Sequence, residues 1–394
     1  MKDIRYNLFK LSVLLLFLQS MFAWFLWGQI VLAIVLCLFL TFIFAFTSSE
    51  SIFSIKKSNL PPIFLIFVIQ VYVVRDQNTN ALIAAFLRII IISTILLLND
   101  KIKIDLFRFL TKSFAILLSI SLFAWILFLL DISLPYFETS FNDEQYIFDN
   151  YYFFLYNHVD MILPIPRFSS VFLEPGQLGM ITSFFLCGNR FDLKRKEILV
   201  IFIATIFTFS LAAYLLLLIS ASVYLTIYSK KPFRNFILWG LFLFLFYSFF
   251  STYNNGDNVV NNLIFERLQS DNGKVAGDNR FSVEMDFYFN RFVNSEDITF
   301  GNGSEGYNKL SLGANAGYKV FFIQYGIVGT VLIFLFYLSV VISKPTKTAW
   351  ILLLVYILCF LQAAYPLWEC ELILFITAIP FFKFKNINEK FRQA

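Results

Sequence analysis

Apolar runs of about twenty residues, separated by short charged connections, are the feature that most constrains how this chain can fold. A helix needs about 20 apolar residues to cross the hydrocarbon core of a bilayer. Ten runs have this length: 8–27, 29–47, 60–74, 80–98, 112–131, 174–189, 234–252, 316–342, 348–367 and 370–384. The chain is 59% hydrophobic and 14% charged, whereas soluble domains have about 45–50% apolar and about 25% charged residues. The sequence therefore predicts an integral membrane protein and excludes an ordinary water-soluble enzyme.

One further apolar run, 197–229, is too long for one crossing and short for two, since it would extend about 50 Å as a helix. Basic residues flank it on both sides, at 194–196 and at 230–231. Because basic residues gather on the cytoplasmic side of a membrane, both ends are expected there. We expect a hairpin with its turn near 208–210, which brings the total to twelve crossings, of which 60–74 is among the shortest.

The distribution of charged residues is consistent with connections that lie alternately on the cytoplasmic and the outer side of the membrane. Connections assigned to the cytoplasm hold 22 Lys and Arg against 7 Asp and Glu, and the remaining chain holds 9 against 19. The formal net charge of +5 therefore reports orientation rather than affinity for acidic partners, and no nucleic-acid partner is expected. The first run follows Lys2, Arg5 and Lys10 and lacks a small-residue cleavage site, so it is predicted to be a retained anchor with the N-terminus inside.

Two connections are long, 132–173 and 253–315, and both fall on the outer side. The predicted fold is all-α and polytopic, with about twelve transmembrane helices, a single membrane domain over 1–394 and two large outer loops. Large loops on one face indicate that the protein acts at the outer surface of the membrane. They argue against a transporter built from two repeated halves. We also detect no internal repeat in this sequence.

Metal chemistry is not expected from the spacing of possible ligands. Three of the four cysteines lie inside apolar runs, and the chain has one histidine, His158. No His/Cys cluster of metal-binding spacing is present in the sequence. We predict neither a metal nor another cofactor.

The first outer loop ends in a polar segment directly before a predicted span. Arg167 opens it, and Glu174 and Pro175 close it. Proline is favoured at a first helical position, and a carboxylate just before it meets the positive end of the helix dipole. Glu174 is thus either a helix cap or part of a polar site in which Arg167 pairs its donors with phosphate oxygens.

The second outer loop carries two arginines, Arg280 and Arg291, and two glycines, Gly301 and Gly303. Such glycines allow backbone amides to approach an anion, but most Gly-x-Gly runs are simply turns. Each arginine can alternatively pair with one of the many acids nearby. The loop ends at Asn315 and continues through Tyr318 into a span.

Arg88 lies about 12 Å along the predicted helix 80–98. A charge at that depth costs on the order of 2.5–3.5 kcal/mol on insertion scales. We therefore expect Arg88 to face the protein interior or a polar cavity and to have a partner.

These segments together resemble the Wzy-type O-antigen and capsular repeat-unit polymerases, a family related to the O-antigen ligases. The resemblance is carried by 167–176 before a span, Arg280 followed by 301–303, and 315–318 leading to 326–329. It covers roughly 160–330, together with the plan of about twelve spans and two outer loops. No motif is specific alone, but their order is fairly specific.

The chain departs from this pattern in two places. Many relatives have a Ser-Arg pair in the hairpin turn, where this chain has Ser210 and Leu211, so one phosphate-binding cation is missing. The ligases use a histidine in the last large loop, where this chain has Asn315. The missing histidine favours a polymerase over a ligase.

The resemblance implies a metal-independent, GT-C-like glycosyltransferase in the bacterial inner membrane, with both termini cytoplasmic. It would transfer a growing chain from undecaprenyl pyrophosphate to a new lipid-linked repeat unit, beside membrane lipid and with a chain-length regulator and a flippase as partners. Arg167 and Arg280 would stabilise the leaving pyrophosphate, and Glu174 would be the base or only a cap. The implied substrate-binding residues are Arg88, Arg291, Gly301, Gly303, Asn315 and Tyr318.

Two other functions stay open. A surface-glycan ligase would use the same outer site for transfer to a different acceptor. A flippase or other transporter of lipid-linked oligosaccharide would need basic residues along several spans, and only Arg88 lies deep in this sequence.

Overall fold

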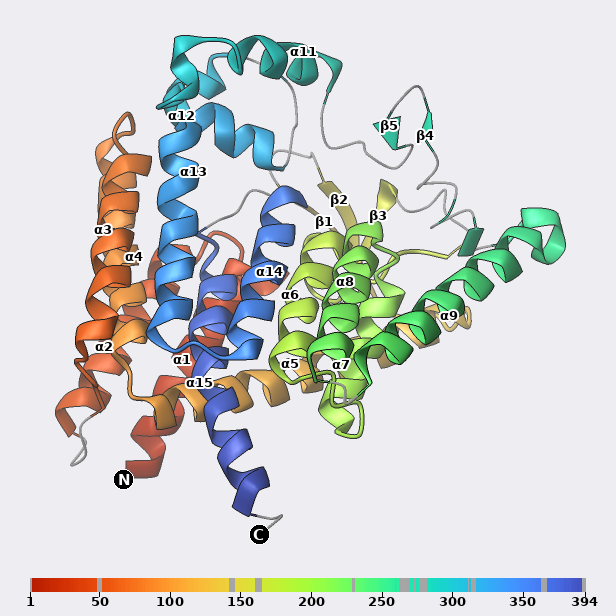
Figure 1. Cartoon of the computed structure of the whole chain (residues 1–394), viewed down its shortest axis with the longest axis horizontal. Coiled ribbons are helices and arrows are strands. Elements are labelled where there is room, and N and C mark those ends of the chain that lie inside the picture. The colour runs from red at the N-terminus through yellow and green to blue at the C-terminus, as the bar shows by residue number, and fades with distance from the viewer. Residues whose placement is uncertain are drawn as a thin grey trace. The chain divides into compact units, whose positions relative to one another are not determined.

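The computed structural model describes residues 2–47, 52–141, 146–159, 165–228, 231–258, 282–310, 317–362 and 367–391, with the short pieces 260–261, 265, 270–271, 274–275 and 312. These residues are mostly helical (Figure 1). The chain forms two compact units. The first comprises Met1–Ser20, Leu26–Leu110 and Arg280–Ala394, and the second comprises Met21–Phe25 and Thr111–Asn279.

The first unit is a helical bundle with a short helical cover at one end. Its long helices are α1 (Lys2–Ser20), α2 (Ile30–Thr47), α3 (Leu60–Val73), α4 (Thr79–Leu97), the beginning of α5 (Asp100–Leu129), α13 (Tyr318–Ser343), α14 (Lys347–Gln362) and α15 (Glu369–Phe391). The short helices α11 (Val283–Phe292) and α12 (Gly303–Asn308) pack on α13. The start of α1 and the end of α15 lie at the opposite end of this unit from α11 and α12 (Figure 1).

The second unit is built around α6 (Pro175–Gly188), which packs on α7 (Lys196–Phe207) and α8 (Leu211–Tyr228). Almost every residue of α6 is buried. A Cβ at Gly179 would lie 2.3 Å from the Cβ of Ala213, so the glycine permits the close approach of α6 to α8. The rest of α5 and α9 (Pro232–Thr252) complete the helices of this unit.

The expected hairpin is confirmed. Helices α7 and α8 divide the run 197–229, and the turn between them is 208–210. Phe209 has a positive φ of 43° in this turn. Among the described residues, each of the other ten apolar runs also overlaps one α-helix, of which α3 and α6 have only 14 residues each.

Five of the described helices are long and apolar enough to cross a membrane: Thr79–Leu97, Asp100–Leu129, Leu211–Tyr228, Phe233–Gly256 and Tyr318–Ser343. Three further apolar helices are shorter, Ile30–Phe46, Lys57–Val73 and Lys347–Leu361. The described residues are thus predominantly helical and include helices that are long and apolar enough to span a membrane.

The first long connection contains a sheet that the all-α prediction omitted. Strands β1 (Phe137–Phe141), β2 (Tyr146–Asn150) and β3 (Leu155–Asn157) pair antiparallel in the order β1-β2-β3. Two further short strands, β4 (Ser270–Asp271) and β5 (Lys274–Val275), pair within the second connection. Along β2, Phe148 and Asn150 are buried while their neighbours are half-buried, so the sheet has an inner and an outer face. A single alternation this short is a weak signal beside long apolar runs.

Candidate functional site

The segment that begins at Arg167 is held between β3 and the end of α7. The Phe168 amide donates to the carbonyl oxygen of Phe207 at 2.9 Å, and the Leu155 amide donates to that of Ser170 at 2.8 Å. Arg167 itself is half-buried. The structure therefore places this arginine at the same end of the second unit as the hairpin turn and the sheet.

Glu174 occupies the N-cap position of α6 but does not cap it with its side chain. Its backbone is extended, with φ −138° and ψ 138°, and its carboxylate makes no capping hydrogen bond. Oε1 instead accepts a hydrogen bond of 2.7 Å from the hydroxyl of Tyr146 on β2. The first turn of α6 thus keeps its positive dipole end without a capping carboxylate.

Three buried polar atoms, one in β2, one in the segment before α6 and one in the first turn of α6, have no hydrogen-bond partner among the described residues. They are Nδ2 of Asn150, Oγ of Ser170 and Oε1 of Gln177. Asn150 pairs across the sheet with Leu155, whose amide bonds to Ser170, and Gln177 lies in the first turn of α6. Each such atom costs about 1–3 kcal/mol when it is left without a partner, so this group is suited to contacting a polar ligand.

The hairpin turn contributes a hydroxyl beside the same helix start. A Cβ at Gly176 would lie 3.9 Å from Oγ of Ser210, so the Ser210 hydroxyl faces the first turn of α6. Leu211, the residue after this turn, begins α8 and is half-buried. We call the following residues the α6 site: Tyr146, Asn150, Arg167, Ser170, Glu174, Gln177 and Ser210.

The outer face of the sheet holds a group of possible metal ligands that sequence spacing does not reveal. Ligand atoms of Glu138, Asp149 and His158 lie within 4.8 Å of one another. Strand pairing places Glu138 opposite Asp149, and Nε2 of His158 lies 3.0 Å from Oδ1 of Asp149. Strand register, rather than spacing along the chain, brings these three groups together, and the prediction that the protein needs no metal stays a prediction. Burial raises the pKa of the Tyr151 phenol nearby, and Asp149 raises it further.

In the first unit, Arg88 has the buried partner that its depth required. Its Nε donates to Oε1 of Glu369, the first residue of α15, at 2.6 Å. The Glu369 side chain is 6% exposed and that of Arg88 is 38% exposed. The pair joins α4 to α15 and neutralises the arginine, which confirms the expected partner.

Gly301 is required by a close approach of two backbones. Its φ is +74°, and a Cβ there would lie 2.5 Å from the carbonyl oxygen of Gln324. Two side chains of the α3–α4 region bind the same turn: the Tyr72 hydroxyl donates to the Phe300 carbonyl at 2.7 Å, and Nη2 of Arg75 donates to it at 2.6 Å. The turn is thereby fixed against α13 and α3.

Gly303 approaches an anion, as its sequence context suggested, but that anion belongs to the protein. A Cβ at Gly303, whose φ is +75°, would lie 2.1 Å from Oδ2 of Asp76. The same oxygen accepts a hydrogen bond of 2.9 Å from the Glu305 amide in α12. The structure therefore gives the Gly301–Gly303 turn a folding role, and its part in substrate binding stays a prediction.

Replacing Gly301 with alanine should destabilise this turn strongly. A non-glycine residue at such a φ costs about 1–3 kcal/mol, and the clash is with backbone, which cannot turn aside. We expect a lower midpoint of thermal unfolding and faster proteolysis within 296–310. Gly240→Ala is the matched control, because a Cβ there meets nothing within 4 Å; equal effects of the two changes would contradict this role.

The remaining predicted site residues are distributed as follows. Arg291 is exposed on α11, with its guanidinium 4.2 Å from the ring centre of Phe287. Tyr318 begins α13, and its ring packs edge-on against Phe289. Arg280 and Asn315 lie outside the described residues. The first unit holds Arg88, Arg291, Gly301, Gly303 and Tyr318, and the second holds Arg167 and Glu174.

Comparison of the chain with the models of protein families, with curated proteins and with solved structures finds no match.

Proposed function

We propose that this protein polymerises undecaprenyl-pyrophosphate-linked oligosaccharide repeat units into O-antigen or capsular polysaccharide. The observation that carries the proposal is the α6 site. It combines an uncapped helix start, a half-buried arginine and three buried polar atoms without partners in the described chain. A helix start without a capping carboxylate is suited to holding phosphate oxygens.

The proposed reaction needs this combination. A sugar is transferred from a pyrophosphate to a hydroxyl, so the glycosidic bond forms as the bond to the pyrophosphate breaks. Negative charge develops on the departing pyrophosphate. Fixed donors aimed at that charge stabilise the transition state more than the ground state, and this differential lowers the barrier. Arg167 and the first-turn amides of α6 would supply these donors, with Arg280 as the second predicted arginine.

The topology is part of the same proposal. Twelve crossings would place both termini in the cytoplasm of a bacterium and the long connections 132–173 and 253–315 on the outer face of its inner membrane. The separation of α11 and α12 from the start of α1 and the end of α15 within the first unit supports this arrangement (Figure 1). The GT-C-like plan of the helices belongs to the proposal as well.

Glu174 is the proposed general base for the acceptor hydroxyl. Its carboxylate makes no capping hydrogen bond to α6, and a hydrogen bond from the Tyr146 hydroxyl orients it. A positioned base takes up the hydroxyl proton as the oxygen attacks the anomeric carbon.

Glu174→Gln should reduce the rate of chain growth about 100-fold, the lower range for loss of a general base. Tyr146→Phe keeps the carboxylate and should cause a smaller loss. Chain growth is measured with purified protein and lipid-linked repeat units. Asp131→Asn, a change at an exposed acid that belongs neither to the α6 site nor to the possible metal ligands, is the control. Normal turnover in Glu174→Gln would remove Glu174 from the chemistry.

A further inference from the structure

Strand pairing in the first long connection brings three side chains with metal-binding atoms to one face of the sheet. In the register of β1 and β2, Glu138 lies directly opposite Asp149, so both side chains point to the same face. On the other side of β2, Asp149 lies opposite Tyr156, and His158 follows two positions later. The possible ligand atoms of Glu138, Asp149 and His158 all lie within 4.8 Å of one another.

The histidine is held beside β2 by a turn at the end of β3. The amide of Val159 donates a hydrogen bond of 3.0 Å to Oδ1 of Asn157, the last residue of β3. An asparagine that accepts from the amide two residues later forms a tight turn, and His158 is its middle residue. Nε2 of His158 then lies 3.0 Å from Oδ1 of Asp149. These two side chains are 31% and 15% exposed, so water shields their charges only in part.

The two carboxylates of this group lack a permanently charged partner. Like charges directly opposite each other on paired strands destabilise a sheet. Among the described residues, no Lys or Arg lies within ion-pair distance of Glu138 or Asp149. A protonated His158 would balance one of the two negative charges. A divalent cation would balance both and would leave the imidazole neutral, as a metal ligand must be.

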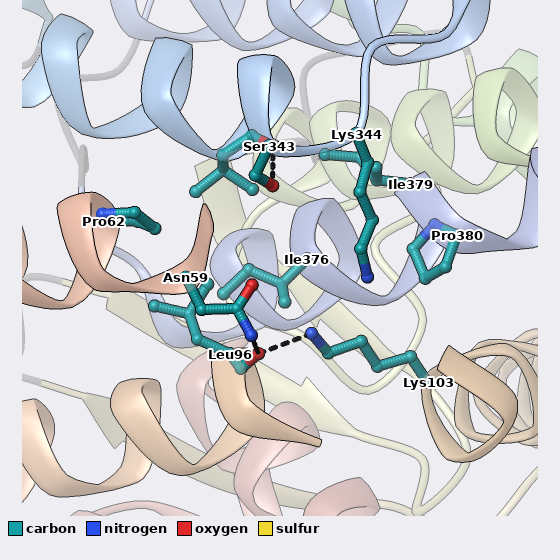
Figure 2. A pocket seen from close by; sticks show the side chains of 10 residues that line it. Asn59, Pro62, Leu96, Lys103, Ser343, Lys344, Ile376, Ile379 and Pro380 are labelled. Atoms are coloured by element: carbon teal, nitrogen blue, oxygen red, sulfur yellow. Dashed lines mark hydrogen bonds between the residues drawn. The ribbon is translucent and has the colours of Figure 1, made fainter. Parts of the chain in front are cut away.

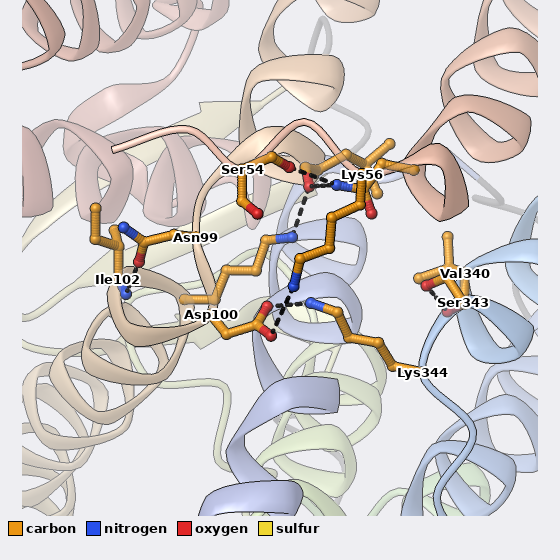
Figure 3. Close-up of polar contacts among 11 residues, drawn as sticks. Ser54, Lys56, Asn99, Asp100, Ile102, Val340, Ser343 and Lys344 are labelled. Atoms are coloured by element: carbon orange, nitrogen blue, oxygen red, sulfur yellow. Dashed lines mark hydrogen bonds and ion pairs between the residues drawn. The ribbon is translucent and has the colours of Figure 1, made fainter. Parts of the chain in front are cut away.

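A carboxylate of the first unit shows the contrasting case, in which the protein supplies the positive charge itself. Lys56 and Lys344 both point toward Asp100 and form ion pairs with it (Figure 3). The cavity beside this group, which Lys103 and Lys344 help to line, has room for about one water (Figure 2). That group therefore needs no bound ion and has no space for a larger ligand. The two carboxylates of the sheet have neither basic partners nor a cover.

The kinds of ligand favour zinc over the common hard cations. Ca²⁺ and Mg²⁺ prefer oxygen ligands throughout, whereas an imidazole nitrogen suits Zn²⁺, which such sites also bind more tightly than Mn²⁺. Zinc lies about 2.0–2.2 Å from nitrogen and carboxylate ligands, which places neighbouring ligand atoms about 3.3 Å apart. The contact between His158 and Asp149 already has this spacing. Glu138 is exposed, so its side chain can rotate to complete the set.

We propose that Glu138, Asp149 and His158 bind one Zn²⁺ ion, with water at the fourth position. Three protein ligands and one water are an established zinc coordination. The ion ties β1 and the turn after β3 to the central strand β2. Zinc here departs from the metal-free protein that ligand spacing predicts, because spacing does not record strand pairing. None of the three ligands belongs to the α6 site, so the ion takes no part in the proposed sugar transfer.

The test titrates Zn²⁺ into full-length, chelator-treated protein by calorimetry, with Ca²⁺ as the second probe. Any polyhistidine tag is removed first, because the chain has a single histidine. We expect one Zn²⁺ per chain and much weaker binding of Ca²⁺. X-ray absorption at the zinc edge should show one imidazole ligand, and this signal should be absent in His158→Gln. Amide hydrogen exchange in β1, β2 and β3 should slow when zinc is added.

Three variants remove the ligands one at a time: Glu138→Gln, Asp149→Asn and His158→Gln. Loss of a partner behind a metal ligand already weakens binding about 10- to 100-fold, so loss of a ligand itself should weaken it by about 100-fold or more. Asp131→Asn is the matched control, since this exposed acid lies between α5 and β1, and it should leave the affinity unchanged. Because Glu138 is exposed, its variant tests the site even if the other two disturb the sheet.

Two results would overturn the site. One is no binding of Zn²⁺, or equal affinity in the wild type and all three ligand variants. The other is an equal loss in Asp131→Asn, which would show that zinc responds to the general negative charge of this region rather than to three specific ligands.

Discussion

Arg167→Ala should reduce chain growth by about 100- to 1000-fold, the loss expected when one fixed donor to a developing oxyanion is removed. Surface glycan should then appear on a gel as lipid-bound single repeat units without a ladder. The reason is that Arg167 lies in the segment that leads into the uncapped start of α6, where we propose that the pyrophosphate is held. The binding of the repeat unit should weaken less than the rate, because the arginine acts mainly on charge that appears during the reaction.

Two further variants define what Arg167 contributes. Arg167→Lys keeps the charge but loses the planar fork, so partial activity would show how much the paired geometry adds. Arg234→Ala removes an exposed arginine at the start of α9 and should leave the ladder intact. A full-length ladder in Arg167→Ala would exclude the assigned role.

The second large effect is expected on stability. Arg88→Met should lower the free energy of unfolding by up to about 3 kcal/mol, because breaking a buried pair leaves one charge uncompensated. Here that charge is Glu369, which is 6% exposed. Because Arg88 is partly exposed, we expect a loss of stability at the low end of the range that is usual when a buried ion pair is broken.

A double-mutant cycle checks this interpretation. Glu369→Gln in the Arg88→Met background removes the remaining charge and should recover most of the lost stability. Thermal unfolding of the purified protein in one detergent provides the measurement. If the double variant is as unstable as the sum of the two single variants, the ion pair is not what holds α4 to α15.

The helices could be predicted because their signals are local. Run length and flanking lysines were enough to divide 197–229 into α7 and α8 and to place the turn at 208–210. The sheet was missed because β1 to β3 are short and their pairing depends on contacts within a long connection. The same pairing gathers Glu138, Asp149 and His158, which no spacing along the chain could indicate.

For the polar residues, the sequence indicated that a side chain requires a partner but did not identify which residue provides it. The depth of Arg88 required a partner, but Glu369 lies 281 positions away and could not be identified from the sequence. The glycines at 301 and 303 were expected either to let amides approach an anion or simply to form a turn. That the anion is Asp76, from the turn between α3 and α4, depends on how distant helices pack. Tyr146 likewise contacts Glu174 only because β2 lies over the start of α6.

The most direct test of the proposed function is a reconstitution with purified protein and one defined undecaprenyl-pyrophosphate-linked repeat unit, without added metal or a second acceptor. The account predicts oligomers of increasing length on the lipid carrier, with one undecaprenyl pyrophosphate released for each bond formed, and loss of both products in Arg167→Ala. Absence of oligomers, together with transfer of the repeat unit once a different acceptor is added in a second reaction, would indicate a ligase. An unchanged repeat unit after incubation with folded protein would contradict the polymerase.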